Sequence, residues 1–166
     1  ICVSLAISGA AEAACSNEAK GDLQFVVCEF KPAEGDIRLF LNDHDGKSYG
    51  DFGPVAAALD AKGEKLLFAM NAGMYHKDRS PVGLYVENYE EKKKLSTKDG
   101  PGNFHLKPNG VFYVWDDFDH RGAAVMTSED YKNQAPTDIV SYATQSGPML
   151  VIDGAIHPRF LVDATS

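Results

Sequence analysis

The sequence lacks any stretch of basic residues long enough to follow a nucleic-acid backbone. Lysine and arginine together number 16, against 24 aspartates and glutamates, so the net charge is −8 at pH 7. Proteins that bind nucleic acids usually carry clustered lysine and arginine, so this balance argues against nucleic acid as a partner. Internal repeats and low-complexity tracts are also missing, which excludes solenoid and fibrous architectures.

Long apolar runs and metal-ligand clusters are missing as well. No apolar run is long enough to cross a membrane, and the five histidines are scattered without the spacing of a zinc site. We therefore expect no transmembrane segment in the mature chain and no cofactor; an oxygen-ligated divalent ion stays open as an alternative. With 166 residues, 44% of them apolar, the chain has the size and composition of one globular domain.

Residues 1–13 resemble the end of a secretory signal peptide. The apolar stretch Ile1–Ile7 is followed by Ala11-Glu12-Ala13, which has the small-residue pattern of a cleavage site. No initiator methionine or basic segment comes before it, so we expect that the chain starts inside its signal sequence and that the protein is exported to the periplasm or the exterior. A lipid anchor on Cys15 is the alternative, although Glu12 stands where a lipobox would have leucine.

Export determines how the cysteines are interpreted. Cys2 would leave with the signal peptide, whereas Cys15 and Cys28 would enter an oxidising compartment in which thiols tend to pair. We predict a disulfide between them that ties the mature N-terminus to the first strand and contributes roughly 3 kcal/mol through loop entropy. The alternative, a catalytic thiol, lacks a neighbouring histidine in the sequence.

The first half of the mature chain predicts two strands, a turn and a helix. Leu23–Phe30 and Asp36–Asn42 read as strands of one hairpin, and Asn42–Gly46 as a solvated turn with only a faint likeness to a calcium loop. Apolar residues then recur at helical spacing over Gly53–Ala61, with a proline near the start and Gly63 just past the end.

The stretch Leu66–Met70 is apolar without alternation, which predicts a short strand buried on both faces. It ends in Asn71-Ala72-Gly73, where the glycine turns the chain and the carboxamide of Asn71 could offer a donor and an acceptor to a ligand. Alternatively, Asn71 only satisfies the backbone of its own turn.

Further strands are expected on either side of a charged block. Leu84–Glu87 reads as a strand and Glu90–Lys94 as a solvated hairpin tip, while Gly102–Val114 contains two strand-like pieces around a Pro-Asn-Gly turn. His105 and Lys107 are two residues apart and would share one strand face. On a pocket wall they would face an anion together; otherwise they are ordinary surface groups.

The last part predicts three strands and a second informative turn. Strands are expected over Ala123–Met126, Ile139–Thr144 and Met149–Ile152, with a capped helical turn at Ser128–Tyr131. The second strand would end in the polar tight turn Gln145-Ser146-Gly147-Pro148 and the third in Asp153-Gly154. Asp153 is then either a functional side chain at a strand end or a plain type I′ or II′ hairpin residue.

Together these elements predict an α+β fold with a mainly antiparallel, twisted sheet and one helix, at about Gly53–Ala61, packed on it. Four motifs, in this order, resemble the phosphodiester glycosidase domain family in its bacterial exported branch: Met70-Asn71-Ala72-Gly73-Met74-Tyr75, Pro81-Val82-Gly83-Leu84, Asn109-Gly110-Val111-Phe112 and Gln145 to Gly154. The likeness covers about residues 22–163, within a partial domain expected at 14–166.

The resemblance implies hydrolysis of a glycosidic bond in a sugar-1-phosphodiester, as in a cell-envelope or exopolysaccharide glycan. It implies a catalytic role for Asp153 and His105, with Lys107 neutralising the leaving phosphate. Asn71 and Gln145 would bind sugar hydroxyls. Three glycines would let the backbone approach the ligand: Gly73, Gly147 and Gly154.

The chain departs from the family pattern at its end. Members continue into a late Leu-Asp-Gly-Gly-like motif that is not found before Ser166, so we expect truncation at both ends, a second catalytic group in the missing part and an inactive fragment. An exposed strand edge and exposed apolar surface should make the fragment aggregate. The alternative function is a non-catalytic carbohydrate- or envelope-binding domain on the same fold.

Overall fold

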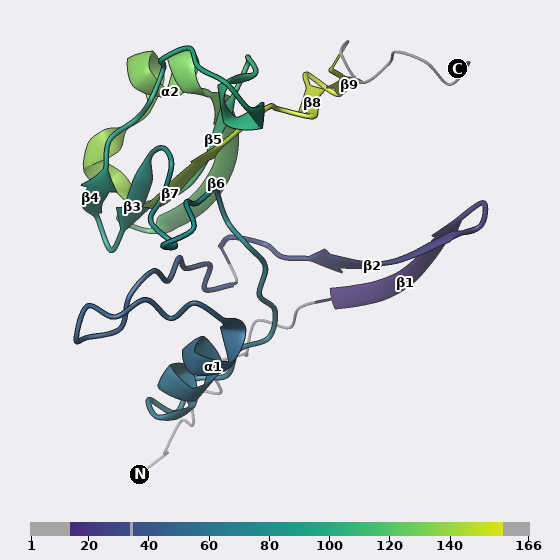
Figure 1. The fold of residues 1–166 in the computed structure, drawn as a ribbon. Coiled ribbons are helices and arrows are strands. Elements are labelled where there is room, and N and C mark those ends of the chain that lie inside the picture. Colours follow the sequence, from purple (N-terminus) through teal and green to yellow (C-terminus); the bar gives the residue numbers. More distant parts are fainter. Residues whose placement is uncertain (1–13, 34, 158–166) are drawn as a thin grey trace. The chain divides into compact units, whose positions relative to one another are not determined.

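The structure is a computed structural model that describes residues 14–33 and 35–157 (Figure 1). The chain divides between Ile37 and Arg38 into two compact units, and each is described by itself. Among the described residues, none of the helices has the length and apolar character needed to cross a membrane. The proposed cleavage site at residues 11–13 lies outside the described residues.

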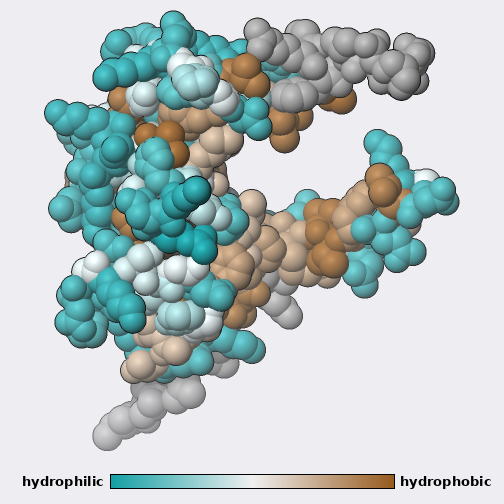
Figure 2. All heavy atoms as spheres, in the orientation of Figure 1, coloured by the Kyte–Doolittle hydropathy of each residue, from teal (hydrophilic) through white to brown (hydrophobic). Residues whose placement is uncertain are grey.

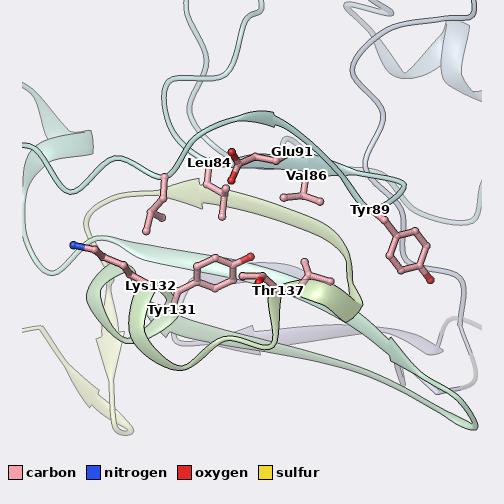
Figure 3. A pocket seen from close by; sticks show the side chains of 9 residues that line it. Leu84, Val86, Tyr89, Glu91, Tyr131, Lys132 and Thr137 are labelled. Atoms are coloured by element: carbon pink, nitrogen blue, oxygen red, sulfur yellow. The ribbon is translucent and has the colours of Figure 1, made fainter.

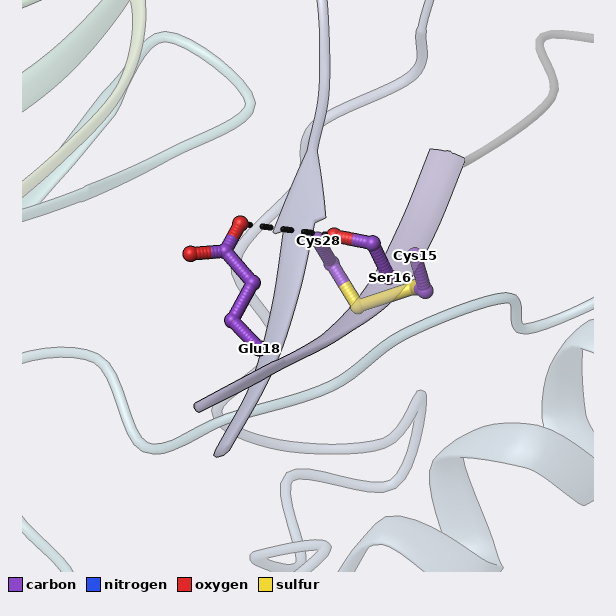
Figure 4. The surroundings of a disulfide bond; sticks show 4 residues. All are labelled: Cys15, Ser16, Glu18 and Cys28. Atoms are coloured by element: carbon purple, nitrogen blue, oxygen red, sulfur yellow. Dashed lines mark hydrogen bonds between the residues drawn. A yellow bond between two sulfur atoms is a disulfide. The ribbon is translucent and has the colours of Figure 1, made fainter. Parts of the chain in front are cut away.

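The first unit is a two-stranded antiparallel hairpin of β1 (Ala14–Lys20) and β2 (Leu23–Glu29). Cys15 lies directly opposite Cys28 in the ladder, and a disulfide joins them (Figure 4). This confirms the predicted disulfide. Because the sulfur of Cys15 is bonded to Cys28, it is not free to carry a lipid thioether.

The predicted hairpin partner of β2 is wrong. Residues 36–40 form no strand, and the following stretch contributes only an isolated bridge between Asn42 and Ser48. β2 pairs instead with β1 across the two-residue turn Gly21-Asp22, a much shorter loop to close. The polar sequence of β1 has little strand character, so its pairing could not be read from propensity.

The second unit begins with a turn and a helix that both match the prediction. In the turn, one carboxylate oxygen of Asp43 accepts the backbone N–H groups of Asp45 and Lys47, at 3.0 and 2.9 Å. Helix α1 (Phe52–Asp60) starts after Asp51, whose carboxylate accepts the N–H of Phe52. Gly63 follows the helix at φ 75°, a conformation that suits glycine.

A five-stranded, fully antiparallel sheet forms the main body of the second unit (Figure 1). The order is β4-β3-β7-β5-β6, which puts β7 in the middle. The elements of this part are β3 (Tyr85–Glu87), β4 (Glu90–Lys93), η1 (Asn103–His105), β5 (Gly110–Asp117), β6 (His120–Thr127), α2 (Ser128–Gln134), η2 (Thr137–Ile139) and β7 (Val140–Ser146). The architecture confirms the α+β prediction, with few helices and a mainly antiparallel sheet.

The core lies on the face of the sheet that α2 covers. Its buried members are Leu84, Val86, Val111, Tyr113, Tyr131, Val140 and Ala143. The chain reverses directly from β6 into α2, and α2 packs against β5 and β6. The helix that packs chiefly on the sheet is therefore α2, not α1 as predicted; α2 follows its strand without a loop, and its Tyr131 enters the core.

The buried strand predicted at Leu66–Met70 is wrong. No strand forms there, and the side chains of Leu67, Phe68 and Met70 are 54%, 45% and 70% exposed. An apolar strand is stable when neighbours pair with it and cover both faces, and no described strand pairs with this stretch. Apolar side chains are also exposed elsewhere: in Figure 2 they gather along the β1–β2 hairpin, where Leu23 and Val26 are exposed.

Two predictions for the segments around the sheet also need correction. The charged block Glu90–Lys93 is the edge strand β4, and the hairpin turn is Asn88-Tyr89, whose φ angles of 53° and 66° are those of a type I′ turn. His105 is not in a strand: the backbone turns after Gly102, at φ 85°, into the short helix η1.

The C-terminal boundaries shift in a similar way. Gln145 and Ser146 continue β7 instead of forming a turn, because they pair with Val111 and Gly110 of β5. The last predicted strand shortens to β8 (Val151–Ile152), which pairs with β9 (Ala155–Ile156).

Candidate functional site

The segment that contains Asn71-Ala72-Gly73 packs closely on the end of β7. A Cβ added to Gly73 would lie 2.3 Å from the side-chain oxygen of Thr144 and 2.5 Å from the backbone oxygen of Gln145. Contacts that short leave no room for any side chain. Glycine at this position therefore brings the segment against β7.

Two further glycines bring other segments to the same place. A Cβ on Gly83 would lie 2.3 Å from Oε1 of Gln145 and 2.5 Å from the ring of Phe104, and one on Gly147 would lie 2.6 Å from the backbone oxygen of Phe104. Residues near 73, 83, 104 and 147 thus converge around Gln145 and Phe104. Each of the four motifs named above contributes to this cluster or adjoins it, the third through Asn109, which lies beside Gly147.

Gln145 is the most connected polar side chain of this cluster and is only 1% exposed. Its Oε1 accepts the backbone N–H groups of Leu84 and Ser96, both at 3.0 Å. Its Nε2 donates to the backbone oxygen of Ser96 and to Oγ of Ser128, both at 2.7 Å. These four bonds use both lone pairs and both hydrogens of the carboxamide.

Gln145 therefore holds together the start of β3, the chain around Ser96 and the first residue of α2. The prediction that it binds a sugar hydroxyl stays a prediction, and such a contact would have to replace one of these four bonds. The sequence showed a glutamine in a polar motif but not its three partners, which lie 17 to 61 residues away along the chain.

His105 and Lys107 both bind the segment 97–99, although they do not share a strand. Nδ1 of His105 lies 3.0 Å from the backbone oxygen of Lys98. Nζ of Lys107 donates to the backbone oxygen of Thr97 at 2.9 Å and forms an ion pair with Asp99 at 2.8 Å. The hydrogen bond that Lys107 donates to Asp99 holds the pKa of the exposed Asp99 carboxyl below its ordinary value.

Two buried polar residues near Lys107 were not singled out as site residues. Asn109, 3% exposed, donates from Nδ2 to the backbone oxygen of Phe104 at 3.1 Å, and its own backbone oxygen accepts the N–H of Ser128. His157, 6% exposed, has Nε2 3.4 Å from the backbone oxygen of Lys107. Asn109 lies in one of the quoted motifs, so its position was visible in the sequence, but its burial was not.

Asn71 and Asp153 are both exposed, and neither side chain makes a hydrogen bond within residues 14–33 and 35–157. Asp153 and Gly154, at φ 50° and 78°, form the type I′ turn of the β8–β9 hairpin, which agrees with the alternative interpretation of Asp153 as a turn residue. The catalytic role of Asp153 and the binding roles of Asn71 and Gly154 stay predictions.

Sequence reasoning missed a buried carboxylate, which lies on the face of β3 opposite the apolar core. Glu87, 6% exposed, accepts a hydrogen bond from the hydroxyl of Tyr85 at 3.2 Å and has Nζ of Lys92 at 3.6 Å. Burial, with the charge of Glu87, raises the pKa of the Tyr85 hydroxyl. Tyr85 pairs with Thr144, which contacts Gly73, so this group faces the side of the sheet on which the Asn71 segment packs.

The part of the chain that the structure describes contains no group of three or more histidine, cysteine, aspartate or glutamate side chains able to hold a metal ion.

Comparison with known proteins gives two matches. A family model described as phosphodiester glycosidase matches residues 64–165. The uncharacterized protein YigE of Escherichia coli (strain K12) is 32% identical over 123 residues, which are 74% of this chain and 45% of that protein. The chain thus spans a little under half the length of this curated relative. No solved structure gives a significant match.

Proposed function

The chain belongs to the phosphodiester glycosidase family, and from that membership we propose that the protein is an exported hydrolase that cleaves the glycosidic bond of a sugar-1-phosphodiester. The observation that carries the proposal is the convergence of the family-like motifs around Gln145 and Phe104 through glycines that leave no space for a side chain. The substrate class we propose is a cell-envelope or exopolysaccharide glycan.

Lys107 is the residue proposed to bind the leaving phosphate. Its ammonium already holds an anionic oxygen, that of Asp99, at 2.8 Å, and a phosphate oxygen would bind in the same way. Stabilising the negative charge that develops on the leaving oxygen lowers the barrier to cleavage. His105, two residues away and bound to the same segment, would hold or pass on a proton at that oxygen.

Asp153 is proposed as the second carboxylate of the reaction. It would act either as a base that takes a proton from water or as a nucleophile at the anomeric carbon. Glycoside hydrolysis commonly uses an acidic group on each side of the scissile bond, one assisting departure and the other acting as base or nucleophile. Water supplies the oxygen that bonds to the anomeric carbon, while the carbon–oxygen bond to phosphate breaks. Asn71 would bind sugar hydroxyls, and the backbone at Gly73, Gly147 and Gly154 would approach the sugar.

Export is proposed because the disulfide between Cys15 and Cys28 suits an oxidising compartment. The second candidate function is a non-catalytic carbohydrate- or envelope-binding domain. The exposed position of Asp153 in a plain hairpin turn, without a hydrogen bond to the other predicted site residues described here, favours this candidate.

The test measures free sugar released from a panel of sugar-1-phosphodiesters by the full-length protein. We expect turnover by the wild type and a loss of at least about 100-fold in Asp153→Asn, the scale typical of a lost acid or base. The control is Asp45→Asn, which changes an exposed aspartate in the turn after Asn42 and should leave turnover unchanged.

Each outcome separates the two candidates. If Asp153→Asn keeps the turnover of the wild type, Asp153 has a structural role in its turn and no catalytic role. Absence of turnover on every substrate, together with saturable binding of a sugar phosphodiester, would favour the binding domain.

A further inference from the structure

A cavity of about 240 Å³ opens between α2 and strands β3 and β4 (Figure 3). Its wall consists of four aliphatic residues, two tyrosines and three other polar residues: Leu84, Val86, Leu95, Val140, Tyr89, Tyr131, Glu91, Lys132 and Thr137. None of the residues predicted as catalytic or substrate-binding lines it, so the cavity has no role in the proposed hydrolysis.

Tyr131 gives this cavity a polar anchor. The side chain is 5% exposed, and its ring is fixed against Tyr113 in a T-shaped contact with centroids 5.3 Å apart. Within residues 14–33 and 35–157 its hydroxyl makes no hydrogen bond, and it faces the cavity (Figure 3). The hydroxyl is the accessible end of this otherwise buried side chain, so it can donate a hydrogen bond to an oxygen of a molecule in the cavity.

The anchor is a hydrogen-bond donor at every physiological pH. Burial and the charge of Glu91 raise the pKa of Tyr131 to about 12, so the hydroxyl keeps its proton. A ligand oxygen could accept this proton in a hydrogen bond. If the ligand oxygen is itself a hydroxyl, it can donate in turn to the carboxylate of Glu91 on the cavity wall.

We infer that this cavity binds one small apolar ring that carries a hydroxyl group, with Tyr131 donating to the ligand oxygen. The aliphatic wall favours a hydrocarbon ring over a bare sugar, and the volume lies below the roughly 300–1,000 Å³ of sites for drug-sized ligands, which limits the occupant to about one ring. The wall carries one carboxylate, that of Glu91, and one ammonium, that of Lys132, so its net charge favours neither an anionic nor a cationic ligand. The inference does not rest on the proposed function.

The experiment compares the binding of p-cresol with that of toluene, which has the same ring without the hydroxyl. The full-length protein is titrated with each compound, and binding is followed by NMR shifts and calorimetry. We expect saturable binding of both, with p-cresol bound more tightly. Tyr131→Phe removes only the hydroxyl, so it should weaken p-cresol binding roughly three- to tenfold, the scale of one hydrogen bond, and leave toluene binding unchanged.

Two variants complete the design. Thr137→Trp adds bulk at the cavity and should weaken both ligands, whereas Tyr49→Phe, a tyrosine outside the cavity lining, should weaken neither. If Tyr131→Phe does not fold, Glu91→Gln serves instead, and it should lower the preference for p-cresol over toluene. The inference is overturned if p-cresol fails to bind saturably, or if the ratio of the two affinities is the same in the wild type and in the folded variant.

Discussion

At the scale of single residues, Gln145 shows how one buried carboxamide can connect distant parts of a chain. It contributes nothing to the apolar core, yet it satisfies two backbone N–H groups, one backbone oxygen and one hydroxyl. Each of these groups would otherwise need another partner, because an unpaired buried polar group is costly. Gln145 thus positions Ser96, the residue directly before Thr97. Lys107 in turn binds the backbone oxygen of Thr97.

Replacing Gln145 with leucine should lower the free energy of unfolding by at least about 2 kcal/mol, because several buried polar groups lose their partner at once. Urea denaturation measures the change. The matched control is Gln134→Leu at the exposed end of α2, where the side chain bonds to the exposed Asp130 and the loss should stay below about 0.5 kcal/mol. Equal losses in both variants would show that the four bonds of Gln145 add no net stability.

At the scale of elements, the molecule relies on close contacts between an irregular segment and a strand. The stretch around Gly73 belongs to no strand, but it packs on β7 without a side chain between them. The segment 97–99 is held from one side by Lys107 and His105, and the neighbouring Ser96 is held from the other by Gln145. Such segments depend on a few contacts, so single substitutions test them well.

Gly73→Ala should cost about 2 kcal/mol of stability, because the new methyl group would collide with backbone as well as with the side chain of Thr144. The control is Gly53→Ala in α1, where nothing outside its chain neighbours lies within 4 Å. Alanine favours a helix, but Pro54 follows and disfavours the helical conformation of a residue with a Cβ, so stability should change by less than about 1 kcal/mol. Thermal unfolding compares the two variants. An unchanged midpoint for Gly73→Ala would contradict the close packing of this segment.

The ion pair between Asp99 and Lys107 should be lost in acid. The pKa of Asp99 is lowered from its ordinary 3.8 in the folded protein, so the bond is intact above that value and is lost as the pH falls through the lowered pKa. An NMR titration of the carboxyl carbon should show this shift, and Lys107→Met should return the pKa to its ordinary value. The control is Lys132→Met in α2, and a similar effect of both variants would refute the assignment to Lys107.

At the scale of the whole molecule, the described chain has a small core and considerable exposed apolar surface. The core lies on the α2 face of one sheet, while the stretch 66–70 is largely exposed. The charged edge strand β4 is protected against pairing with another chain, since lysines and glutamates on an edge discourage it. The stretch 66–70 has no comparable protection.

We therefore expect the 166-residue chain to associate through this stretch, and Met70→Lys to reduce the association by placing a charge in it. Light scattering against protein concentration measures the effect. Ala57→Lys adds the same charge on exposed α1 and is the control. Equal reduction by both variants would attribute the change to net charge and not to residues 66–70.

Much of the local structure could be predicted from the sequence. Helix α1 with its terminal Gly63, the turn at Asp43 and the strands around Tyr85, Val111 and Val125 all follow from spacing, turn residues or alternation, which act between near neighbours in the chain. The disulfide was predicted instead from the expected oxidising compartment. The four motifs also pointed to the family, which the family match then showed.

The tertiary structure decided what depends on distant partners. The apolar stretch 66–70 has the composition of a strand, but a strand exists only where another strand supplies its hydrogen bonds, and none of the described strands does so. In the same way, Gln145 looked like a turn residue because its partners Leu84, Ser96 and Ser128 are remote in sequence. Local sequence determines which conformations a segment favours, whereas pairing and burial depend on which other segments the fold brings to it.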